Sequence, residues 1–506
     1  MLPTEFSPLF LNNAPFADRA VMDSLHYSLQ DCEEYFTLFP DEITARQQII
    51  RDLLNDEPFY QAFCNACDKL DELYELVRNL GNNQTDSAED LLYALVELLT
   101  FTNTANAIDD AYSAAKHLYS ERLIAFFESV RRMKEDDEYR ALTNWLNELD
   151  ENMRSIRSIT FGANLDAQLN ITEVGIVSIN NQPFVCGNAF DKVMRNEQPP
   201  AEFECISVVG IHEVKQLLQN SRLVINSEFY ISMNILYRSA LKNLRKRINA
   251  SAFGTIRALT AMRGDLHFLL CAVKMLRRQK EFGFPLTFPE IGTETTVENL
   301  YNPLLAEKCR IDDIVPSALN FTEMERVFIM TGPNSGGKSV YVGAVGMAQL
   351  SFQLGLPICA SGRVRMKPYK RIVTHFIEES KRDTESRLAN ESQRLHKTLH
   401  GITEDTLLLL DETFSSTSAY DALFLSESLM RYLSKIGCDV IYVTHLHELP
   451  MRLADISSLR HIAPAVYGGR RAYRITTYSG KEETASLAKD IVIENGLGFL
   501  FEDDVK

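Results

Sequence analysis

Eight residues in the second half of the chain have the composition and spacing of a phosphate-binding loop. They fit the pattern G-x-x-x-x-G-K-[ST] at every fixed position and are Gly332, Pro333, Asn334, Ser335, Gly336, Gly337, Lys338 and Ser339. Glycines let the backbone curl so that successive N–H groups point at an anion. Lys338 is expected to bridge the terminal phosphates of a nucleotide, and the Ser339 hydroxyl to coordinate Mg²⁺.

The segments on either side of this loop argue against the alternative interpretation, an ordinary glycine-rich loop exposed to solvent. An apolar strand, "RVFIM", is expected before it, and a helix over "SVYVGAVGMAQLSFQLG" after it. A helix that begins at the loop adds the positive end of its dipole to the anion site. Strand, loop and helix in this order predict a nucleotide-binding P-loop.

A pair of acids ends a second apolar segment, "TLLLLDETFSS" (406–416). We expect this strand to lie beside the P-loop strand and to present its acids to the metal. Asp411 would reach Mg²⁺, directly or through water, and Glu412 would orient and polarise an attacking water molecule. A surface pair is the alternative, but the position about 70 residues beyond a P-loop favours the catalytic interpretation.

A histidine follows a third apolar segment, "DVIYVTHLHEL" (439–449). Taken alone, His445 would more often be structural. As the third polar group at a strand end in this order, it is expected to hydrogen-bond the γ-phosphate or the water and so to sense the nucleotide.

The composition limits the class of protein. The 506 residues are enough for roughly three domains. Lys and Arg total 52 against 69 Asp and Glu, so the net charge of −17 argues against a chain coated in positive charge for nucleic acid. No window approaches a membrane-spanning length, and the N-terminal segment is a poor signal peptide. Nine scattered cysteines favour reduced thiols in the cytoplasm.

The pattern along the chain divides it into four parts. Helical spacing predicts a core or lever of long helices over 1–156, and short Ile- and Val-rich segments predict a strand-rich insertion over 157–215. Helical spacing resumes over 216–295. From 296 to 506, strands and helices alternate, which is the signature of a parallel α/β domain.

The motifs together resemble those of the MutS family of DNA mismatch-repair ATPases. "TGPNSGGKS" is similar to the family's TGPN-x-GGKS loop, "DETFSSTSAYDA" (411–422) to the segment after its DE pair, and "VTHLHEL" to its histidine segment. The resemblance implies an ABC-like P-loop ATPase domain with a mostly parallel sheet, preceded by a helical core and lever with a small clamp-like insertion. It also implies ATP and Mg²⁺ as cofactors, and a dimer, expected to be a homodimer, in which each subunit completes the other's site.

This chain also departs from the family's pattern. It is too short for both the mismatch-reading domain and the connector, so the resemblance implies a truncated form. The family's F-x-E mismatch probe has a counterpart in Phe126-Phe127-Glu128, which sits within a predicted helix and is interpreted as coincidence. Ser386 and Glu391 in "SRLANE" (386–391) are the candidates for the family's signature serine, which acts on the partner subunit, and for the glutamate that follows it. Phe414-Ser415-Ser416 replaces the family's G-R-G.

The resemblance therefore predicts a Mg-dependent ATPase that binds double-stranded or branched DNA as an ATP-gated dimeric clamp, in repair or recombination. Candidate contacts to the phosphate backbone form one basic run: Arg238, Lys242, Arg245, Lys246 and Arg247. A second run, "GRVRMKPYKR" (362–371), is interpreted as structural or dimer-related. Two alternatives stay open: an ATP-switched assembly or regulatory module without direct DNA binding, and a nucleotide-binding remnant that no longer hydrolyses.

Overall fold

The chain folds into two compact units. The first contains residues 1–9 and 56–267, and the second contains residues 10–55 and 268–506. The computed structural model describes residues 5–6, 9–10, 19–29, 31–80, 88–154, 158–168, 171–180, 182, 207–209, 250–333, 336–376, 387–467 and 470–478. The edges of the units do not coincide with the four parts expected from the sequence, because residues 10–55 pack with the C-terminal half. The four-part division stays a prediction.

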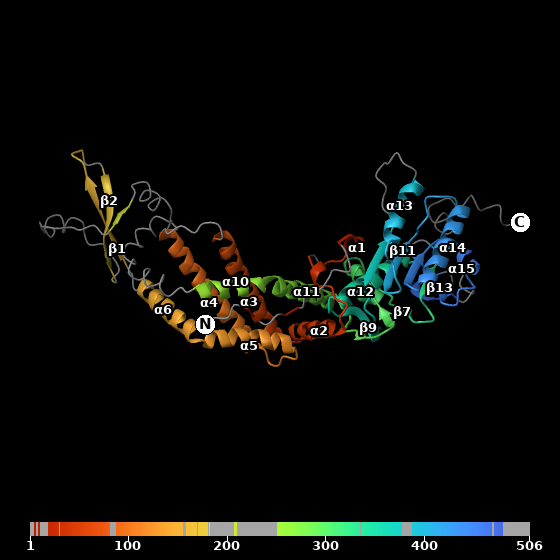
Figure 1. Ribbon diagram of the computed structural model, residues 1–506, viewed down its shortest axis with the longest axis horizontal. Coiled ribbons are helices and arrows are strands. Elements are labelled where there is room, and N and C mark those ends of the chain that lie inside the picture. The colour runs from red at the N-terminus through yellow and green to blue at the C-terminus, as the bar shows by residue number, and fades with distance from the viewer. Residues whose placement is uncertain are drawn as a thin grey trace. The chain divides into compact units, whose positions relative to one another are not determined.

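The first unit is built largely from long helices, which Figure 1 shows in orange and green. They are α3 (Glu57–Leu80), α4 (Ala88–Ala114), α5 (Glu121–Glu135), α6 (Asp137–Arg154) and α10 (Ala250–Ala261), and α11 (Arg263–Glu281) begins here. The apolar positions of α3 recur every three or four residues and are at most 3% exposed: Phe59, Phe63, Ala66, Leu70 and Leu73. Helix α3 packs against α4, so this stripe is a packing face, as its spacing predicts.

The F-x-E tripeptide lies inside α5. Phe126 and Phe127 are 0% and 2% exposed, and Phe127 stacks on Tyr112 with the ring centroids 5.2 Å apart. These rings are core residues of the helical unit, so their interpretation as coincidence is consistent with the structure.

Three segments expected to be strands form a small antiparallel sheet in the same unit. They are β1 (Ser158–Leu165), β2 (Ile171–Asn180) and β3 (Ser207–Val209), in the order β1-β2-β3.

The second unit contains a six-stranded sheet in the order β10-β11-β12-β8-β13-β14. The strands are β8 (Val327–Met330), β10 (Arg371–His375), β11 (Thr406–Asp411), β12 (Asp439–Val443), β13 (Leu459–Tyr467) and β14 (Arg470–Thr477). The first five in this order are parallel, and β14 is antiparallel to β13. The expectation that the DE strand lies beside the P-loop strand was wrong, because β12 lies between β11 and β8.

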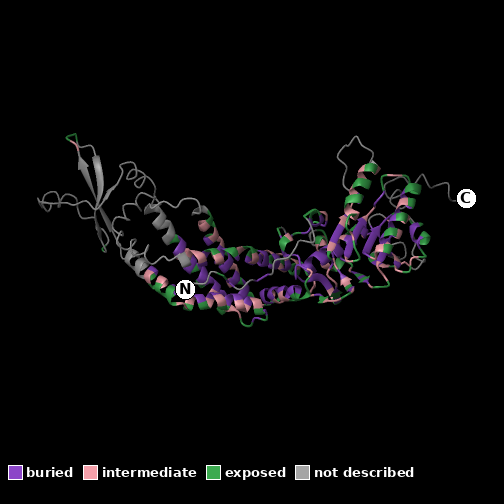
Figure 2. Ribbon diagram, in the orientation of Figure 1, coloured by how far each residue is buried: buried purple, intermediate pink, exposed green. Residues whose placement is uncertain are grey.

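Helices cover both faces of this sheet. Helix α12 (Lys338–Gln353) packs on the face that carries Leu409, whereas α13 (Arg387–Leu399), α14 (Ala419–Ile436) and α15 (Leu449–Arg452) share a core with Leu408 and Leu410. Alternate residues of one strand point to opposite faces. Because both faces are covered, β11 is an uninterrupted apolar run, and its interior is buried (Figure 2).

A second, mixed sheet and an N-terminal segment complete this unit. The sheet contains β4 (Leu286–Thr287), β5 (Glu290–Ile291), β6 (Thr295–Leu300), β7 (Ser317–Phe321) and β9 (Ile358–Met366), with short 3₁₀ turns at Pro303–Glu307 and Ile311–Asp313. The N-terminal segment forms α1 (Arg19–Ser24), a 3₁₀ turn at Glu33–Tyr35 and α2 (Pro40–Asn55). It supports α12 directly: the Tyr27 hydroxyl lies 2.9 Å from the Ser351 hydroxyl, and Gln353 donates to the Thr37 carbonyl at 3.1 Å.

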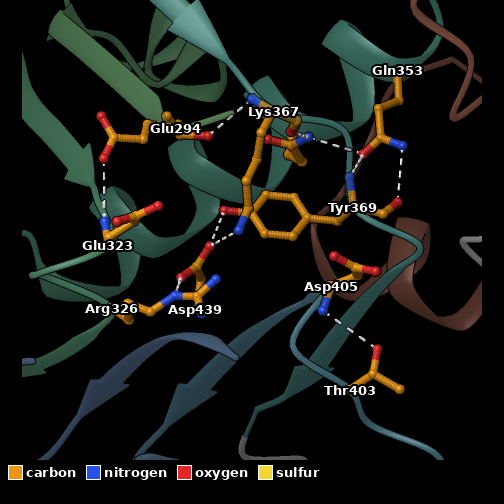
Figure 3. A network of polar contacts seen from close by, with 11 residues as sticks. Glu294, Glu323, Arg326, Gln353, Lys367, Tyr369, Thr403, Asp405 and Asp439 are labelled. Carbon is orange, nitrogen blue, oxygen red and sulfur yellow. Dashed lines mark hydrogen bonds and ion pairs between the residues drawn. The ribbon is translucent and has the colours of Figure 1, made fainter. Parts of the chain in front are cut away.

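A buried carboxylate holds the end of the six-stranded sheet that is remote from the P-loop (Figure 3). Asp439, the first residue of β12, accepts from Arg326 at 3.0 Å, from Lys367 at 2.5 Å and from the Tyr369 hydroxyl at 2.8 Å. Lys367 belongs to the second basic run, in which Lys370 also pairs with an acid of this chain, Asp405. These cations are engaged within the unit, which supports the structural interpretation of that run.

Among the described residues, no helix combines the length and the apolar character that a membrane crossing requires.

Candidate nucleotide-binding site

The polar groups predicted from the sequence follow neighbouring parallel strands, whose carboxyl ends lie at the same edge of the sheet. Asp411 of β11 pairs with Val443 of β12, which pairs with Met330 of β8. The ladder continues one step further, because the Glu412 N–H donates to the Val443 carbonyl at 2.9 Å and the Thr444 N–H to the Met330 carbonyl at 3.0 Å. The carboxyl ends of parallel strands are where open α/β sheets bind ligands.

The P-loop leaves β8 with a backbone that requires glycine. Gly332 has φ = 140° and Gly337 has φ = 85°, both in the region that favours glycine. A Cβ at Gly332 would lie 2.8 Å from Pro464 Cδ, so β13 also leaves no room for a side chain. Gly337 precedes α12, whose first turn starts at Lys338, and the helix therefore begins at the loop as expected.

Lys338 is buried and points back over the loop. Its ammonium group donates to the carbonyls of Gly332 at 2.9 Å and Pro333 at 3.0 Å. Burial lowers the pKa of Lys338, and the nearby carboxylates of Glu412 and Asp411 partly offset this effect. An anion placed in the loop would stabilise the charged form of this lysine and so oppose the effect of burial.

Asp411 lies beside the start of α12. The Ser339 hydroxyl hydrogen-bonds its carboxylate, while Oδ1 of Asp411 is buried and has no hydrogen-bond partner among the described residues. Burial raises the pKa of Asp411, and Glu412 raises it further, against the opposing effects of Ser339, Lys338 and His445. A buried carboxylate oxygen without a partner next to a hydroxyl is a donor set that suits Mg²⁺, a hard cation that prefers oxygen ligands.

Glu412 and His445 form a pair at the mouth of the site. His445 Nε2 lies 2.7 Å from Glu412 Oε1, with the side chains 42% and 30% exposed. The glutamate is held in a left-handed conformation with φ = 53°. The structure therefore brings together the side chains of Lys338, Asp411, Glu412 and His445, whose functional roles stay predictions.

Two contacts at the site are not predicted by the sequence. The Thr331 hydroxyl lies 2.7 Å from His461 Nε2, which links the start of the P-loop to β13. Glu391 of α13 accepts two hydrogen bonds from the loop after Glu412. Alternate residues of a strand point to the same face, so His461 lies on the same face of β13 as Leu459 and Ala463. This alternation is the feature of the sequence that could have predicted the contact between Thr331 and His461.

Several predicted site residues lie outside the described residues. They are Asn334 and Ser335 of the P-loop, the signature candidate Ser386, and the whole basic run Arg238, Lys242, Arg245, Lys246 and Arg247.

Comparison with known proteins finds a family model that matches the region of the site and relatives that match most of the chain. Residues 328–484 match the family model MutS domain V. The chain is 24% identical over 468 residues to DNA mismatch repair protein MutS of Clostridium perfringens, which covers 84% of this chain and 48% of that protein. DNA mismatch repair protein MutS of an Exiguobacterium species is 22% identical over 443 residues, or 86% and 48% of the two chains.

A shorter match links part of the chain to a relative with a different name. Endonuclease MutS2 of Borreliella burgdorferi is 30% identical over 164 residues, which are 32% of this chain and 20% of that protein. The chain spans about half the length of the curated MutS relatives that match most of it, at 48% in both cases. The motifs, the strand-end geometry and these matches together support membership of the MutS family, and residues 328–484 match the family's domain V.

Proposed function

We propose that this chain is a Mg-dependent ATP hydrolase that binds DNA as an ATP-gated dimeric clamp in repair or recombination. The observation that carries the proposal is the convergence of Lys338, Ser339, Asp411 and Glu412 at one edge of a parallel sheet. Five parallel strands with helices on both faces support the finer assignment to an ABC-like P-loop fold, preceded by a helical core and lever with a clamp-like insertion.

The P-loop would bind the phosphates of ATP. Lys338 already faces inward, where two loop carbonyls occupy its ammonium group. A phosphate oxygen would replace these neutral carbonyl acceptors with an anionic one, so that both the donor and the acceptor of the hydrogen bond would carry charge. The loop amides and the N-terminus of α12 add further favourable charge.

Ser339 and Asp411 are the residues that would hold Mg²⁺. When bound, the ion neutralises charge on the β- and γ-phosphate oxygens. Asp411 is prepared for this task because its buried Oδ1 has no protein donor in the described structure. Oxygen ligands from one hydroxyl and one carboxylate match sites in which Mg²⁺ keeps its remaining positions for water and phosphate.

Glu412 would orient the attacking water molecule and accept its proton. The contact at 2.7 Å with His445 Nε2 fixes the direction of the glutamate carboxylate. His445 would in turn hydrogen-bond the γ-phosphate or the water, so the pair distinguishes ATP from ADP.

The relatives support the DNA-binding part of the proposal. Two of them are named DNA mismatch repair proteins. The basic run between Arg238 and Arg247 would supply sequence-independent contacts to phosphates. Ser386 would complete the site of a second copy of the chain, so that ATP joins two ATPase domains.

Phosphate release separates a working ATPase from a nucleotide-binding remnant. We expect the unaltered protein to hydrolyse ATP with Mg²⁺, and Glu412→Ala to lose about a hundredfold or more of the rate, since it removes the group that orients the water. Glu404→Ala is the matched control, because Glu404 is exposed near the opposite end of β11. Equal, near-zero rates for the unaltered protein and Glu412→Ala would rule out hydrolysis.

An electrophoretic shift assay tests the DNA-binding part. Homoduplex, mismatched duplex and a four-way junction are compared with and without ATP. We expect a shift that weakens steeply with salt, and a smaller salt slope when Arg245, Lys246 and Arg247 are replaced by alanine. No shift on any substrate at low salt would favour an assembly or regulatory module without direct DNA binding.

A further inference from the structure

The loop that carries Glu412 (residues 412–416, the Glu412 loop) is tied to helix α13 by one carboxylate. The Phe414 N–H donates to Oε1 of Glu391 at 2.5 Å, and the Ser416 hydroxyl donates to Oε2 at 2.5 Å. Both oxygens of this glutamate are therefore engaged by the same short loop. Hydrogen bonds to a charged acceptor are short and about twice as strong as neutral ones.

The backbone of the Glu412 loop needs such a restraint. Glu412 and Phe414 have φ = 53° and φ = 67°, in the left-handed region that side chains other than glycine rarely adopt. A residue in this conformation is strained and persists only where the surroundings fix it. The Phe414 ring supplies part of this restraint, since it is 6% exposed and packs in a core that includes Leu395 of α13.

A second restraint reaches the loop from β12. The Tyr442 hydroxyl donates to the Thr413 carbonyl at 3.0 Å and lies 2.7 Å from the Ser426 hydroxyl. Burial raises the pKa of Tyr442 to about 12, so this hydroxyl keeps its proton at neutral pH. Strand β12 fixes the base of the loop, whereas Glu391 fixes its far side.

Glu412 lies between these two restraints. Its N–H is held by the Val443 carbonyl at 2.9 Å, and its carbonyl accepts from the Ser415 N–H at 3.3 Å, within the turn that Glu391 closes. We propose that Glu391 is a positioning residue that aligns the Glu412 carboxylate with His445 and the P-loop. The orientation of α13 thereby sets the rate of hydrolysis. This inference rests on the proposed ATPase function.

Steady-state kinetics test the inference through the separation of kcat from KM. We expect Glu391→Ala to lower kcat about ten- to a hundredfold while KM for ATP changes less than about twofold, because misplacement of a catalytic group affects the chemical step rather than binding. Glu391→Gln keeps an acceptor for the Phe414 N–H and is expected to restore part of kcat. The matched control is Gln393→Ala, an exposed position on the same helix.

A double-mutant cycle identifies the contact responsible. Ser416→Ala should lower kcat less than Glu391→Ala, and the double variant should match Glu391→Ala, since groups that share one contact are not additive. A kcat for Glu391→Ala within about twofold of that for Gln393→Ala would overturn the inference, as would fully additive effects.

Hydrogen–deuterium exchange without nucleotide provides a readout that does not depend on turnover. Glu391→Ala and Glu391→Gln should speed exchange in residues 412–416, with the larger effect for alanine, whereas Gln393→Ala should not. Unchanged exchange in both Glu391 variants would overturn the inference. If the unaltered protein hydrolyses ATP no faster than Glu412→Ala, the proposed function fails, while the exchange result still decides whether Glu391 holds the loop.

Discussion

At the level of single residues, Asp411 shows most clearly how the site is prepared for a ligand. Its carboxylate is largely removed from water, and one oxygen has no partner within the described structure. Burial raises the pKa of Asp411 because the charged form loses hydration. In the protein without ligand this residue therefore works against folding, and a bound cation would remove the penalty.

Asparagine at position 411 should stabilise the protein without ligand at neutral pH. The pKa of Asp411 is higher in the folded than in the unfolded state, so its contribution to stability is present below its ordinary pKa of about 3.9 and is lost as the pH rises through the raised value. Asp411→Asn should unfold a few degrees higher at pH 7, about 1 kcal/mol, and the gain should shrink toward pH 4.

Thermal unfolding by circular dichroism without Mg²⁺ or nucleotide measures this difference. Asp313→Asn is the control, since Asp313 is exposed in a 3₁₀ turn of the same unit. A lower unfolding midpoint for Asp411→Asn at pH 7 would contradict the assignment of Asp411 as a destabilised ligand.

At the level of secondary structure, α12 connects the P-loop to the N-terminal segment. A Cβ at Gly346 would lie 2.5 Å and 2.7 Å from the two methyl groups of Leu25, and 3.0 Å from Leu409 Cδ1. Leu25 and Leu409 are 2% and 0% exposed, so neither can move into solvent. The close approach of helix, sheet and N-terminal segment thus depends on glycine at this position.

Gly346→Ala should destabilise the protein by about 1–3 kcal/mol, because overpacking outweighs the higher helix propensity of alanine. Gly343 of the same helix is the matched control: an added Cβ would meet only Asn302 Nδ2, at 3.4 Å. Gly343→Ala should therefore be neutral or stabilising by up to about 1 kcal/mol. Urea unfolding compares the two, and a Gly346→Ala variant as stable as Gly343→Ala would refute the packing described here.

The sequence predicted the strand ends of the site but not the order of the strands. Each motif follows an apolar segment, so Asp411, Glu412 and His445 could be placed at one edge of a sheet. The insertion of β12 between β11 and β8 depends on how helical connections cross the sheet, which local spacing does not encode. The left-handed backbone conformation of Phe414 could not be predicted from the sequence either. Phenylalanine disfavours this conformation, which contacts with Glu391 and the core impose.

Residues 10–55 illustrate the same limit for long-range packing. Their helical spacing predicts an apolar face but does not specify which partner covers it. The structure places this segment with the C-terminal half, where Tyr27 and Thr37 contact α12.

At the level of the whole molecule, the proposal requires two chains for one complete site. Light scattering after gel filtration should give twice the chain mass of 57.5 kDa for Glu412→Ala with Mg-ATP, because this variant would accumulate the ATP-bound form. Lys338→Ala should remain monomeric under the same conditions. Full turnover by a protein that stays monomeric with ATP would exclude the composite site.

The central claim is that residues 332–339 bind the triphosphate of ATP with Asp411 and Glu412 facing it. Titration calorimetry with Mg-ATP tests it most directly, on folded protein and on two lysine variants. We predict saturable heat for the unaltered protein and for Lys435→Ala, an exposed lysine of α14, and a loss of that heat in Lys338→Ala. No heat with the unaltered protein, or the same binding by Lys338→Ala, would contradict the account.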